Sequence, residues 1–293
     1  MKALLYIEMK DGAPAGASLE LIRAAEAIGA KTDLISVNTA EGILEEDAVT
    51  AAVTDRARST GADIVLLAAT TLGKLAAPRI AARLNAGSVN DAIRIEVTGG
   101  KIAALRPVYS GTIQEKILID TASAVISVRG GSYEAPEEVP EITAVDAELP
   151  EGRVFAKIRE AIEEAGETAK LEDAKIIVTG GRGMGTVEDF ALCAQLAEVL
   201  GGVVGATRPA IENGWINRTH QVGQSGKIVA PDLYIACGVS GATQHVSGMS
   251  GSKYIISINK DEDAPIFAVS DIGIVGDAKQ ILPLMIEELR KRK

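Results

Sequence analysis

The residues best suited to bind a ligand lie in the second half of the chain, in short polar segments beside apolar runs. These segments read ATRPA (206–210), QVGQSGK (221–227), GVSGATQH (238–245), SINKD (257–261) and GIVGD (273–277). Each follows or precedes a predicted strand, and a doubly wound sheet brings such loops to one crevice at the carboxyl edge of its strands. Together they would present Arg208, Gln221, Gln224, Ser225, Ser240, Thr243, Gln244, His245, Asn259 and Asp277. This set suits a large polar cofactor with a diphosphate, sugars and a heteroaromatic ring.

A glycine-rich turn, IIVTGGRGMG (176–185), stands between a predicted strand and a predicted helix. Backbone N–H groups and the positive end of a helix favour a phosphate at such a turn, and Arg182 could bond a pyrophosphate oxygen. The spacing is not GxGxxG, because Thr186 occupies the last position, and no acidic residue follows the next strand, where Arg208 stands instead. NAD is therefore disfavoured, while nucleotide binding and a tight structural turn both stay open.

Motifs for bond-breaking chemistry are missing from the sequence. In GQSGKI, Gln221 replaces the first glycine of a P-loop by spacing, and Ile228 replaces the Ser or Thr that binds magnesium. No serine or cysteine triad stands out, and Cys193 and Cys237 lie in apolar settings typical of buried, reduced thiols. With two isolated histidines, a zinc site is not expected. The chain is predicted to bind a cofactor and to lack acid–base machinery.

Several of these side chains also have a purely structural interpretation. His245 could simply decorate a helix start, and Arg208 could form a surface salt bridge. His220 is expected to face solvent from a loop, and Trp215 to anchor the long loop around it. These alternatives stay open at the level of sequence.

The first half of the chain alternates strand-like and helix-like runs, which predicts a parallel sheet with crossover helices. Strands are predicted at 3–8, 32–37 and 62–70, and helices at 18–30, 45–61 and 73–86. A hairpin around Gly99-Gly100 and one or two strands over 116–131 then predict a mixed sheet with an antiparallel edge. The acidic segment 135–150, with three prolines, is expected to be an extended edge segment that leaves the domain. A connecting helix over 155–167 follows.

The second half restarts the alternation and predicts an open, doubly wound parallel sheet. Its predicted strands are 175–179, 203–208, 233–239, 254–259 and 265–269, its helices are 187–201, a short one within 241–249, and 278–293, and 273–277 is a further segment. The fold class is therefore α/β, with an N-terminal mixed-sheet domain over 1–168 and a C-terminal ligand-binding domain over 169–293.

The composition excludes several classes of protein. The chain is 47% hydrophobic and 24% charged, which excludes disorder, and its net charge of -10 argues against nucleic acid as the main partner. No apolar run is long enough to span a membrane, so no membrane insertion is expected. Glu8 comes too early for a signal peptide, so a cytoplasmic location, or the mitochondrial matrix in a eukaryote, is expected.

The second-half motifs together resemble the alpha subunit of electron transfer flavoprotein. The resemblance rests on GGRGMG, VGATRPAIENGWI, QVGQSGKIVAPDLYIACGVSGATQHVSGM, INKDEDAPIF and DIGIVGD, which cover most of residues 175–280 in that order. The first domain agrees in pattern and length but carries weaker signatures. The resemblance implies one FAD in the second domain and an obligate heterodimer with a beta subunit, which the first domain would contact. That beta subunit would carry AMP or a second FAD.

The resemblance also implies a set of FAD-binding residues. The set is Arg182, Thr207, Arg208, Gln221, Val222, Gly223, Gln224, Ser225, Ser240, Gly241, Ala242, Thr243, Gln244, His245, Asn259 and Asp277. By resemblance, Arg182 meets the diphosphate, Thr207 and Arg208 lie beside the isoalloxazine ring, and the Ser225 hydroxyl lies near flavin N5. Residues 240–245 follow the ribityl chain and the pyrimidine side, and 259 and 277 hold the adenosine.

This assignment agrees with the chemistry of a one-electron carrier. A singly reduced, anionic flavin carries charge near N1 and the C2 carbonyl, where Arg208, and His245 if protonated or donating, would supply positive character. By resemblance, the chain would pass electrons from acyl-CoA dehydrogenases of fatty-acid oxidation, or related flavoenzymes, to a quinone oxidoreductase.

Three alternatives remain at this level. The first is an electron-bifurcating form that oxidises NADH and reduces ferredoxin or flavodoxin together with an acyl-CoA dehydrogenase or quinone. The second is a nucleotide-binding regulatory module without redox function. The third is a domain like the cofactor-binding middle domain of thiamine-diphosphate enzymes.

Overall fold

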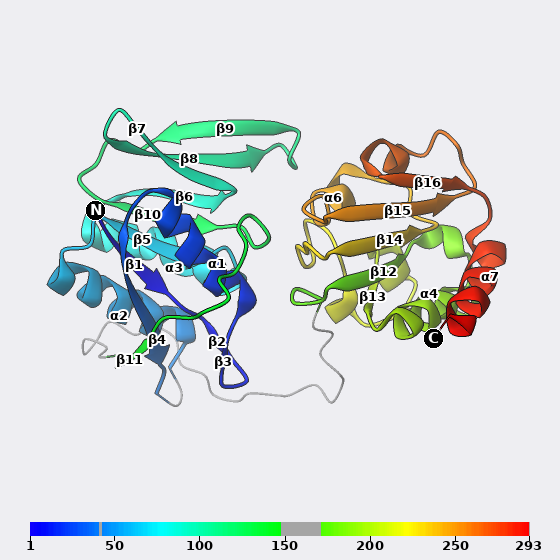
Figure 1. The fold of residues 1–293 in the computed structure, drawn as a ribbon, viewed down its shortest axis with the longest axis horizontal. Helices are drawn as coiled ribbons and strands as arrows, with labels where there is room; N and C mark the ends of the chain where they lie inside the picture. Colours follow the sequence, from blue (N-terminus) through cyan, green and yellow to red (C-terminus); the bar gives the residue numbers. More distant parts are fainter. Residues whose placement is uncertain (41–42, 148–170, 293) are drawn as a thin grey trace. The chain divides into compact units, whose positions relative to one another are not determined.

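The chain folds into two α/β units, which are described separately. The computed structural model describes residues 1–40, 43–147 and 171–292. The units are Met1–Glu164 and Ala165–Lys293 (Figure 1). Their division falls outside the described residues, as does the helix predicted over 155–167, so the boundary after residue 168 stays a prediction.

The first unit is built on a parallel sheet of six strands in the order β11-β4-β1-β5-β10-β6. The strands are β1 (Lys2–Tyr6), β4 (Lys31–Asn38), β5 (Ile64–Ala68), β6 (Gly87–Ala92), β10 (Ala124–Val128) and β11 (Thr143–Asp146). The predicted βαβ alternation is confirmed. So is the extended edge segment, because β11 pairs with β4 at one end of the sheet.

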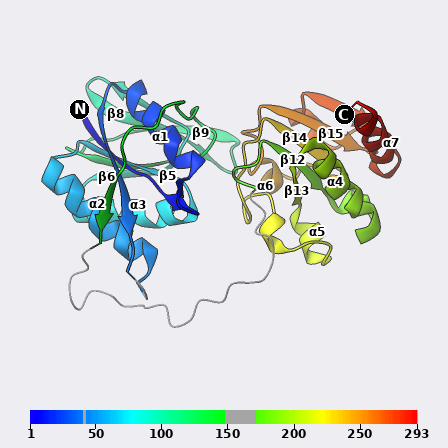
Figure 2. The same ribbon diagram turned by 60° about the horizontal axis from the view of Figure 1, so that its bottom comes forward.

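Three helices cover the two faces of this sheet: α1 (Gly16–Ala27), α2 (Glu45–Thr60) and α3 (Thr71–Leu84). Leu21 and Ile22 of α1 belong to one core cluster. Helices α2 and α3 lie together on the opposite face, where Val53 and Ile80 share the second cluster (Figure 2). Apolar residues at helical spacing thus produce the packing that their periodicity predicts.

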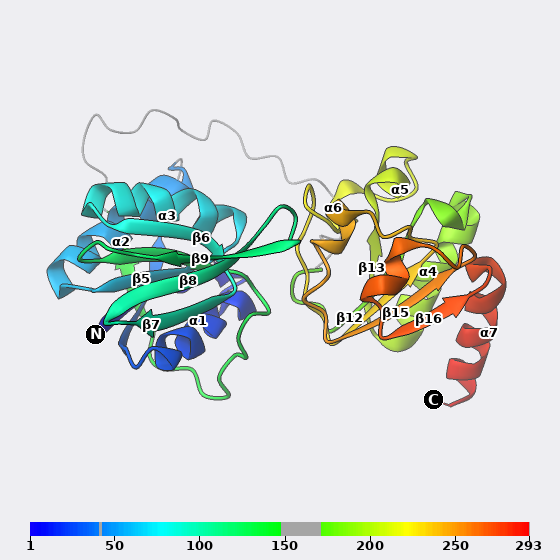
Figure 3. The same cartoon turned by 90° about the horizontal axis from the view of Figure 1, so that it is seen from above.

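The antiparallel strands form a separate sheet, so the prediction of an antiparallel edge on the first sheet is wrong. Strands β7 (Arg94–Thr98), β8 (Lys101–Val108) and β9 (Ile113–Leu118) make a three-stranded sheet, and the predicted turn at Gly99-Gly100 joins the first two. Figure 3 shows this sheet laid across the α1 side of the unit. Ile95 and Ile102 enter the α1 core there, because a hairpin buries its apolar side better on a sheet face than at an edge. A further two-stranded hairpin joins β2 (Met9–Lys10) and β3 (Ala13–Pro14).

The second unit is built on a parallel sheet of five strands in the order β13-β12-β14-β15-β16. The strands are β12 (Ile176–Gly180), β13 (Val203–Ala206), β14 (Leu233–Cys237), β15 (Tyr254–Asn259) and β16 (Ile272–Val275). The helices are α4 (Val187–Leu200), α5 (Arg208–Glu212), α6 (Thr243–Val246) and α7 (Ala278–Lys291), with 3₁₀ turns at Arg182–Met184, Arg218–His220 and Pro265–Val269. This strand order is doubly wound, and its direction of winding reverses between β12 and β14.

The two faces of this second sheet are covered in different ways. Helices α4 and α7 pack on one face through residues such as Leu196 and Leu282. The other face is covered mainly by loop segments, whose Val222, Met249 and Ile266 lie in one core cluster with β14. The loops that were predicted to bind a ligand therefore also cover half of the core.

Some local predictions need correction. Residues 265–269 form a 3₁₀ turn and not a strand, because Pro265 has no N–H to offer a ladder and one turn is enough to bury Ile266. His220 is half-buried, and its Nδ1 lies 2.8 Å from the Val204 carbonyl, so it does not simply face solvent.

Other local predictions are confirmed. Trp215 packs against Phe190 with ring centroids 5.9 Å apart, which anchors the long loop as expected. Cys193 and Cys237 are buried free thiols.

Candidate functional site

The ends of all five strands of the second sheet meet at one edge. Gly180 is in register with both Ala206 and Cys237, Cys237 pairs with Ile258, and Asn259 pairs with Val275. The segments that begin at 181, 207, 238, 260 and 276 therefore leave the sheet side by side. The predicted convergence of the polar loops is confirmed.

The glycine-rich turn is fixed by close contact with the end of β14. The Gly181 N–H donates to the Cys237 carbonyl and the Gly183 N–H to the Gly238 carbonyl, each at 2.9 Å. A Cβ on Gly181 would stand 2.3 Å from the Gly238 oxygen, so this glycine is required by the packing itself. The structural interpretation of the turn is therefore confirmed. Nucleotide binding by the turn, which lies at the switch point of the sheet, stays a prediction.

The turn carries an exposed cation, and the residue that follows the turn caps the next helix. Arg182 is exposed and forms no ion pair with any described residue. Thr186, which breaks the GxGxxG spacing, caps α4 by accepting from the Asp189 N–H at 3.2 Å. Its hydroxyl therefore caps the helix through a side-chain hydrogen bond, for which a glycine has no oxygen.

Segment 221–227 is joined to its neighbours by backbone hydrogen bonds. The Val222 N–H donates to the Ala206 carbonyl at 2.9 Å, and the Gln224 N–H donates to the Gln244 carbonyl at 2.8 Å. The Gln221 amide donates to Ser225 Oγ at 2.9 Å. These bonds hold the loops after β13 and β14 together as one unit.

His245 is buried between two protein partners. Its Nδ1 lies 3.1 Å from the Val222 carbonyl, and its Nε2 lies 3.0 Å from the Tyr234 hydroxyl. A carbonyl can only accept, so Nδ1 carries the proton and Nε2 of the neutral ring accepts from Tyr234. Burial lowers the pKa of His245 from 6.5 to about 4, against a smaller opposing effect of the bond to Val222.

These contacts correct the role expected of His245. The ring is neutral near pH 7, so it supplies no positive charge to a ligand, and both of its nitrogens already have partners. It does not decorate the start of α6 either, because only 7% of its surface is exposed. Its observed role is to connect β14 with the two site loops.

Thr207 and Arg208 are adjacent after β13 but differ in exposure and in hydrogen bonding. Arg208 begins α5 and pairs with Glu212 at 2.8 Å, with 68% and 58% of the two side chains exposed. Such a surface pair contributes little and can open easily. Thr207 is only 7% exposed, and its hydroxyl is buried without a hydrogen-bond partner among the described residues.

Asn259 and Asp277 use their side chains within the protein. The Asn259 amide donates to the Val239 carbonyl at 2.8 Å, and its oxygen accepts from the Asp261 N–H at 3.1 Å. Asp277 caps α7 by accepting from the Lys279 N–H at 3.0 Å. Gly241 is buried with φ of 87° against Ile266. The members that face solvent are Arg182, Arg208, Gln224, Ser225, Ser240, Ala242, Thr243 and Gln244.

Comparison with known proteins decides the family. Residues 170–250 match the electron transfer flavoprotein FAD-binding domain, and residues 34–151 match the electron transfer flavoprotein domain. Protein FixB of Clostridium saccharobutylicum is 38% identical over 98% of this chain and 96% of its own length. The chain belongs to the electron transfer flavoprotein alpha-subunit family.

Other relatives agree with this membership. The electron transfer flavoprotein subunit alpha of Bacillus subtilis is 42% identical over 78% of this chain and 71% of its own length, and that of Mycobacterium leprae is 34% identical over 100% and 99%. A solved structure of a putative thiamin diphosphate-dependent enzyme from Mycobacterium smegmatis matches at 13% identity with a TM-score of 0.24, over 98% of this chain and 59% of that chain. That likeness is too weak to support any conclusion.

Membership in the electron transfer flavoprotein family indicates which class of ligand this site would bind. The matched FAD-binding domain indicates flavin binding, and its residues 170–250 contain the glycine turn, Thr207 and the loops around His245. The unpartnered hydroxyl of Thr207 and the unpaired Arg182 are what a polar ligand at this edge would satisfy. The residues present therefore fit a FAD. The family is one of electron-carrier subunits that pair with a beta subunit.

Two residues at the site, Tyr234 and Lys279, are not among those predicted from the sequence. Tyr234 lies inside an apolar strand, and the only signal was that a buried tyrosine hydroxyl needs a hydrogen-bond partner. Lys279 lies two residues after the cap of α7, and its Nζ reaches Asp189 of α4 at 3.7 Å. Nothing in the spacing of 189 and 279 indicates that they meet.

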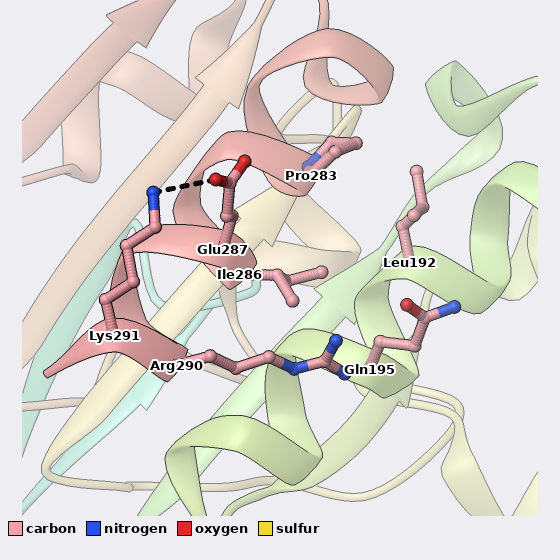
Figure 4. A pocket seen from close by; sticks show the side chains of 7 residues that line it. All are labelled: Leu192, Gln195, Pro283, Ile286, Glu287, Arg290 and Lys291. Carbon is pink, nitrogen blue, oxygen red and sulfur yellow. Dashed lines mark ion pairs between the residues drawn. The ribbon is translucent and has the colours of Figure 1, made fainter. Parts of the chain in front are cut away.

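A hollow on the second unit lies apart from these residues. It has a volume of about 420 Å³ and is lined by α4 and α7 (Figure 4). Leu192 and Ile286 form part of its wall, and the ion pair between Lys291 and Glu287 lies at its rim. None of its lining residues belongs to the predicted set. Among the described residues, no group of three or more His, Cys, Asp or Glu side chains could hold a metal ion.

Proposed function

We propose that this chain is the FAD-carrying alpha subunit of a heterodimeric electron transfer flavoprotein. One FAD would lie along the carboxyl edge of the second sheet, and the beta subunit would carry AMP or a second FAD. The single observation that supports this most strongly is that the matched FAD-binding region, residues 170–250, contains the segments that follow β12, β13 and β14, where the buried Thr207 hydroxyl has no partner among the described residues.

The proposed contacts follow the order of the strands. Arg182 would bind the diphosphate beside the glycine turn. Thr207 and Arg208 would lie beside the isoalloxazine ring, with Arg208 released from Glu212 to place its guanidinium near N1 and the C2 carbonyl. Because His245 is neutral in this structure, Arg208 would supply the positive charge in that region.

The loops would hold the rest of the cofactor. Residues 222–225 would pass the ring, with the Ser225 hydroxyl near N5, and Gln221 would orient Ser225 through the bond that it already makes. Residues 240–245 would follow the ribityl chain and the pyrimidine side. Asn259 and Asp277 would lie near the adenosine, where their existing bonds keep the backbone in place.

We propose acyl-CoA dehydrogenases or related flavoenzymes as electron donors and a quinone oxidoreductase as acceptor. An electron-bifurcating form that oxidises NADH is the second candidate, and the partner subunit would decide between them. A bound FAD supplies one-electron chemistry, and the chain's own residues would orient it, exclude water and set its potential.

The test is direct. The full chain, co-expressed with its beta subunit, is expected to purify yellow and to release FAD on denaturation, identified by chromatography. A colourless heterodimer that takes up no added FAD would reject the proposal. Reduction by NADH without an added dehydrogenase would favour the bifurcating form.

A further inference from the structure

Two side chains of opposite charge flank the end of the glycine-rich turn. Lys279, in the first turn of α7, and Asp189, in the first turn of α4, lie 3.7 Å apart from Nζ to Oδ2. Gly185 lies beside both, because a Cβ built there would be 3.6 Å from Lys279 Nζ and 3.9 Å from Asp189 Oδ2. A lysine that is distant in sequence thus reaches the turn.

The position of Lys279 is fixed by its own helix cap. Its N–H donates to Asp277 Oδ1 at 3.0 Å, so the backbone at 279 is held where α7 begins. The side chain is 40% exposed and Asp189 is 33% exposed, so neither charge is fully screened by water.

Two carboxylates near the turn would repel an anion if no cation balanced them. The first turn of α4 carries Glu188 and Asp189, which favour the helix but repel a phosphate at the same N-terminus. Arg182 is the cation on the turn itself. Lys279 adds a second positive charge, and it stands beside one of the two carboxylates.

A second observation points to a ligand at this place. Thr207 N–H donates to the Gly180 carbonyl at 3.1 Å, so Thr207 directly adjoins the start of the turn. Its hydroxyl is buried and has no partner among the described residues, although such groups are nearly always hydrogen-bonded. A polar ligand atom beside the turn would satisfy it.

We propose that Lys279 is a positioning residue for the FAD diphosphate, and that it acts by neutralising Asp189. With Asp189 paired, the N-terminus of α4 and Arg182 attract the diphosphate. Without the lysine, the free carboxylate repels it. This inference rests on the proposed function, because it needs FAD to bind at this edge.

The experiment measures FAD affinity on the full chain with its beta subunit, stripped of flavin and titrated by fluorescence. Lys279→Met is expected to weaken FAD binding about fivefold at low salt, with a smaller loss at high salt. Adding Asp189→Asn to that variant is expected to restore the wild-type affinity. Lys291→Met, at the other end of α7, is the matched control and should bind like wild type.

The outcomes separate the possible roles. If Asp189→Asn fails to restore binding to Lys279→Met, the lysine does not act through Asp189 and the proposal is overturned. Unchanged affinity in Lys279→Met overturns it as well. Asp189→Asn alone should bind FAD at least as tightly as wild type, and thermal unfolding of the stripped variants checks that they are folded. If wild type itself binds no FAD, the proposed function fails first.

Discussion

The hydroxyl oxygen of Tyr234 lies 3.0 Å from Nε2 of His245, and both side chains are buried. The opposite ring nitrogen bonds the Val222 carbonyl, so one imidazole joins a core strand to two site loops. From the sequence and the resemblance, His245 is expected to supply positive character to the flavin if it is protonated or donates a hydrogen bond. In the structure the His245 ring is neutral, and its two hydrogen bonds hold the site loops in position against β14.

Removing the tyrosine hydroxyl should therefore weaken the fold. Tyr234→Phe leaves Nε2 of His245 buried without a donor, which costs about 1–3 kcal/mol of unfolding free energy. Urea unfolding of the flavin-free protein measures this loss. Tyr254→Phe is the control, because Tyr254 is 65% exposed and should change little. Equal stability of both variants would show that the bond contributes nothing.

The neutral histidine predicts a pH dependence of stability. The folded pKa of about 4 lies below the unfolded value of 6.5, so the unfolded chain takes up a proton first as the pH falls. The contribution of His245 is therefore complete above pH 6.5 and is lost as the pH falls towards 4. Between pH 7 and pH 5 the loss is about 2 kcal/mol.

The measurement compares wild type with His245→Gln at both pH values. The variant should lose about 2 kcal/mol less unfolding free energy between pH 7 and pH 5 than wild type does, because the other titrating groups cancel in the comparison. An identical pH dependence in the two proteins would contradict a buried neutral His245.

Thr207→Val should separate ligand binding from stability. The hydroxyl has no partner in the part of the chain that the structure describes, so the flavin-free variant should unfold at the same or a slightly higher denaturant concentration. FAD binding should weaken about tenfold, because one bond to the ligand is lost. Titration of the stripped protein tests this, with Thr219→Val on the same connection as control. A loss of stability without a loss of affinity would show that Thr207 is structural.

Arg208→Ala should change the reduction potential of bound FAD more than it changes the stability of the protein. Among the described residues the guanidinium pairs only with exposed Glu212, so stability should change by less than about 1 kcal/mol. The first reduction potential of bound FAD should fall by about 30–60 mV, because a stabilising charge is removed. Reductive titration with reference dyes measures it.

The partner residue offers the control for this experiment. Glu212→Ala releases Arg208 without removing it, and should not lower the potential. A potential that does not move in Arg208→Ala would place the arginine away from the ring.

Arg182→Ala should purify with less FAD. Arg182 is exposed, without an ion pair among described residues, so its loss should leave the fold intact. The ratio of FAD to protein after purification is the readout. Full retention of FAD would argue against the diphosphate contact.

Local pattern predicted most of the fold, and contacts between distant segments explain what it missed. Runs such as Ile64–Ala68 and Leu233–Cys237 are strands because apolar residues flanked by turns leave few other choices. Strands β7 to β9 form a separate sheet because their apolar side chains pack over α1 and one face of the main sheet. This contact joins segments that are distant in sequence, so no local pattern could predict it.

The site shows the same division. Convergence of the loops follows from parallel strands, so it could be predicted. The pairing of Arg208 with Glu212 could also be predicted, because the two residues are four positions apart on a helix. The partners of His245 lie 11 and 23 residues away from it in the sequence, and the contact of Lys279 with Asp189 joins two different helices. These contacts depend on tertiary packing alone.

One face of the second sheet is covered mainly by loop segments, and these same segments carry most of the proposed ligand contacts. Val222 and Met249 are 2% and 0% exposed, so these segments are part of the core as well as of the proposed site. A substitution that opened them would therefore expose apolar side chains to water and displace ligand contacts at once, so stability and affinity would be lost together.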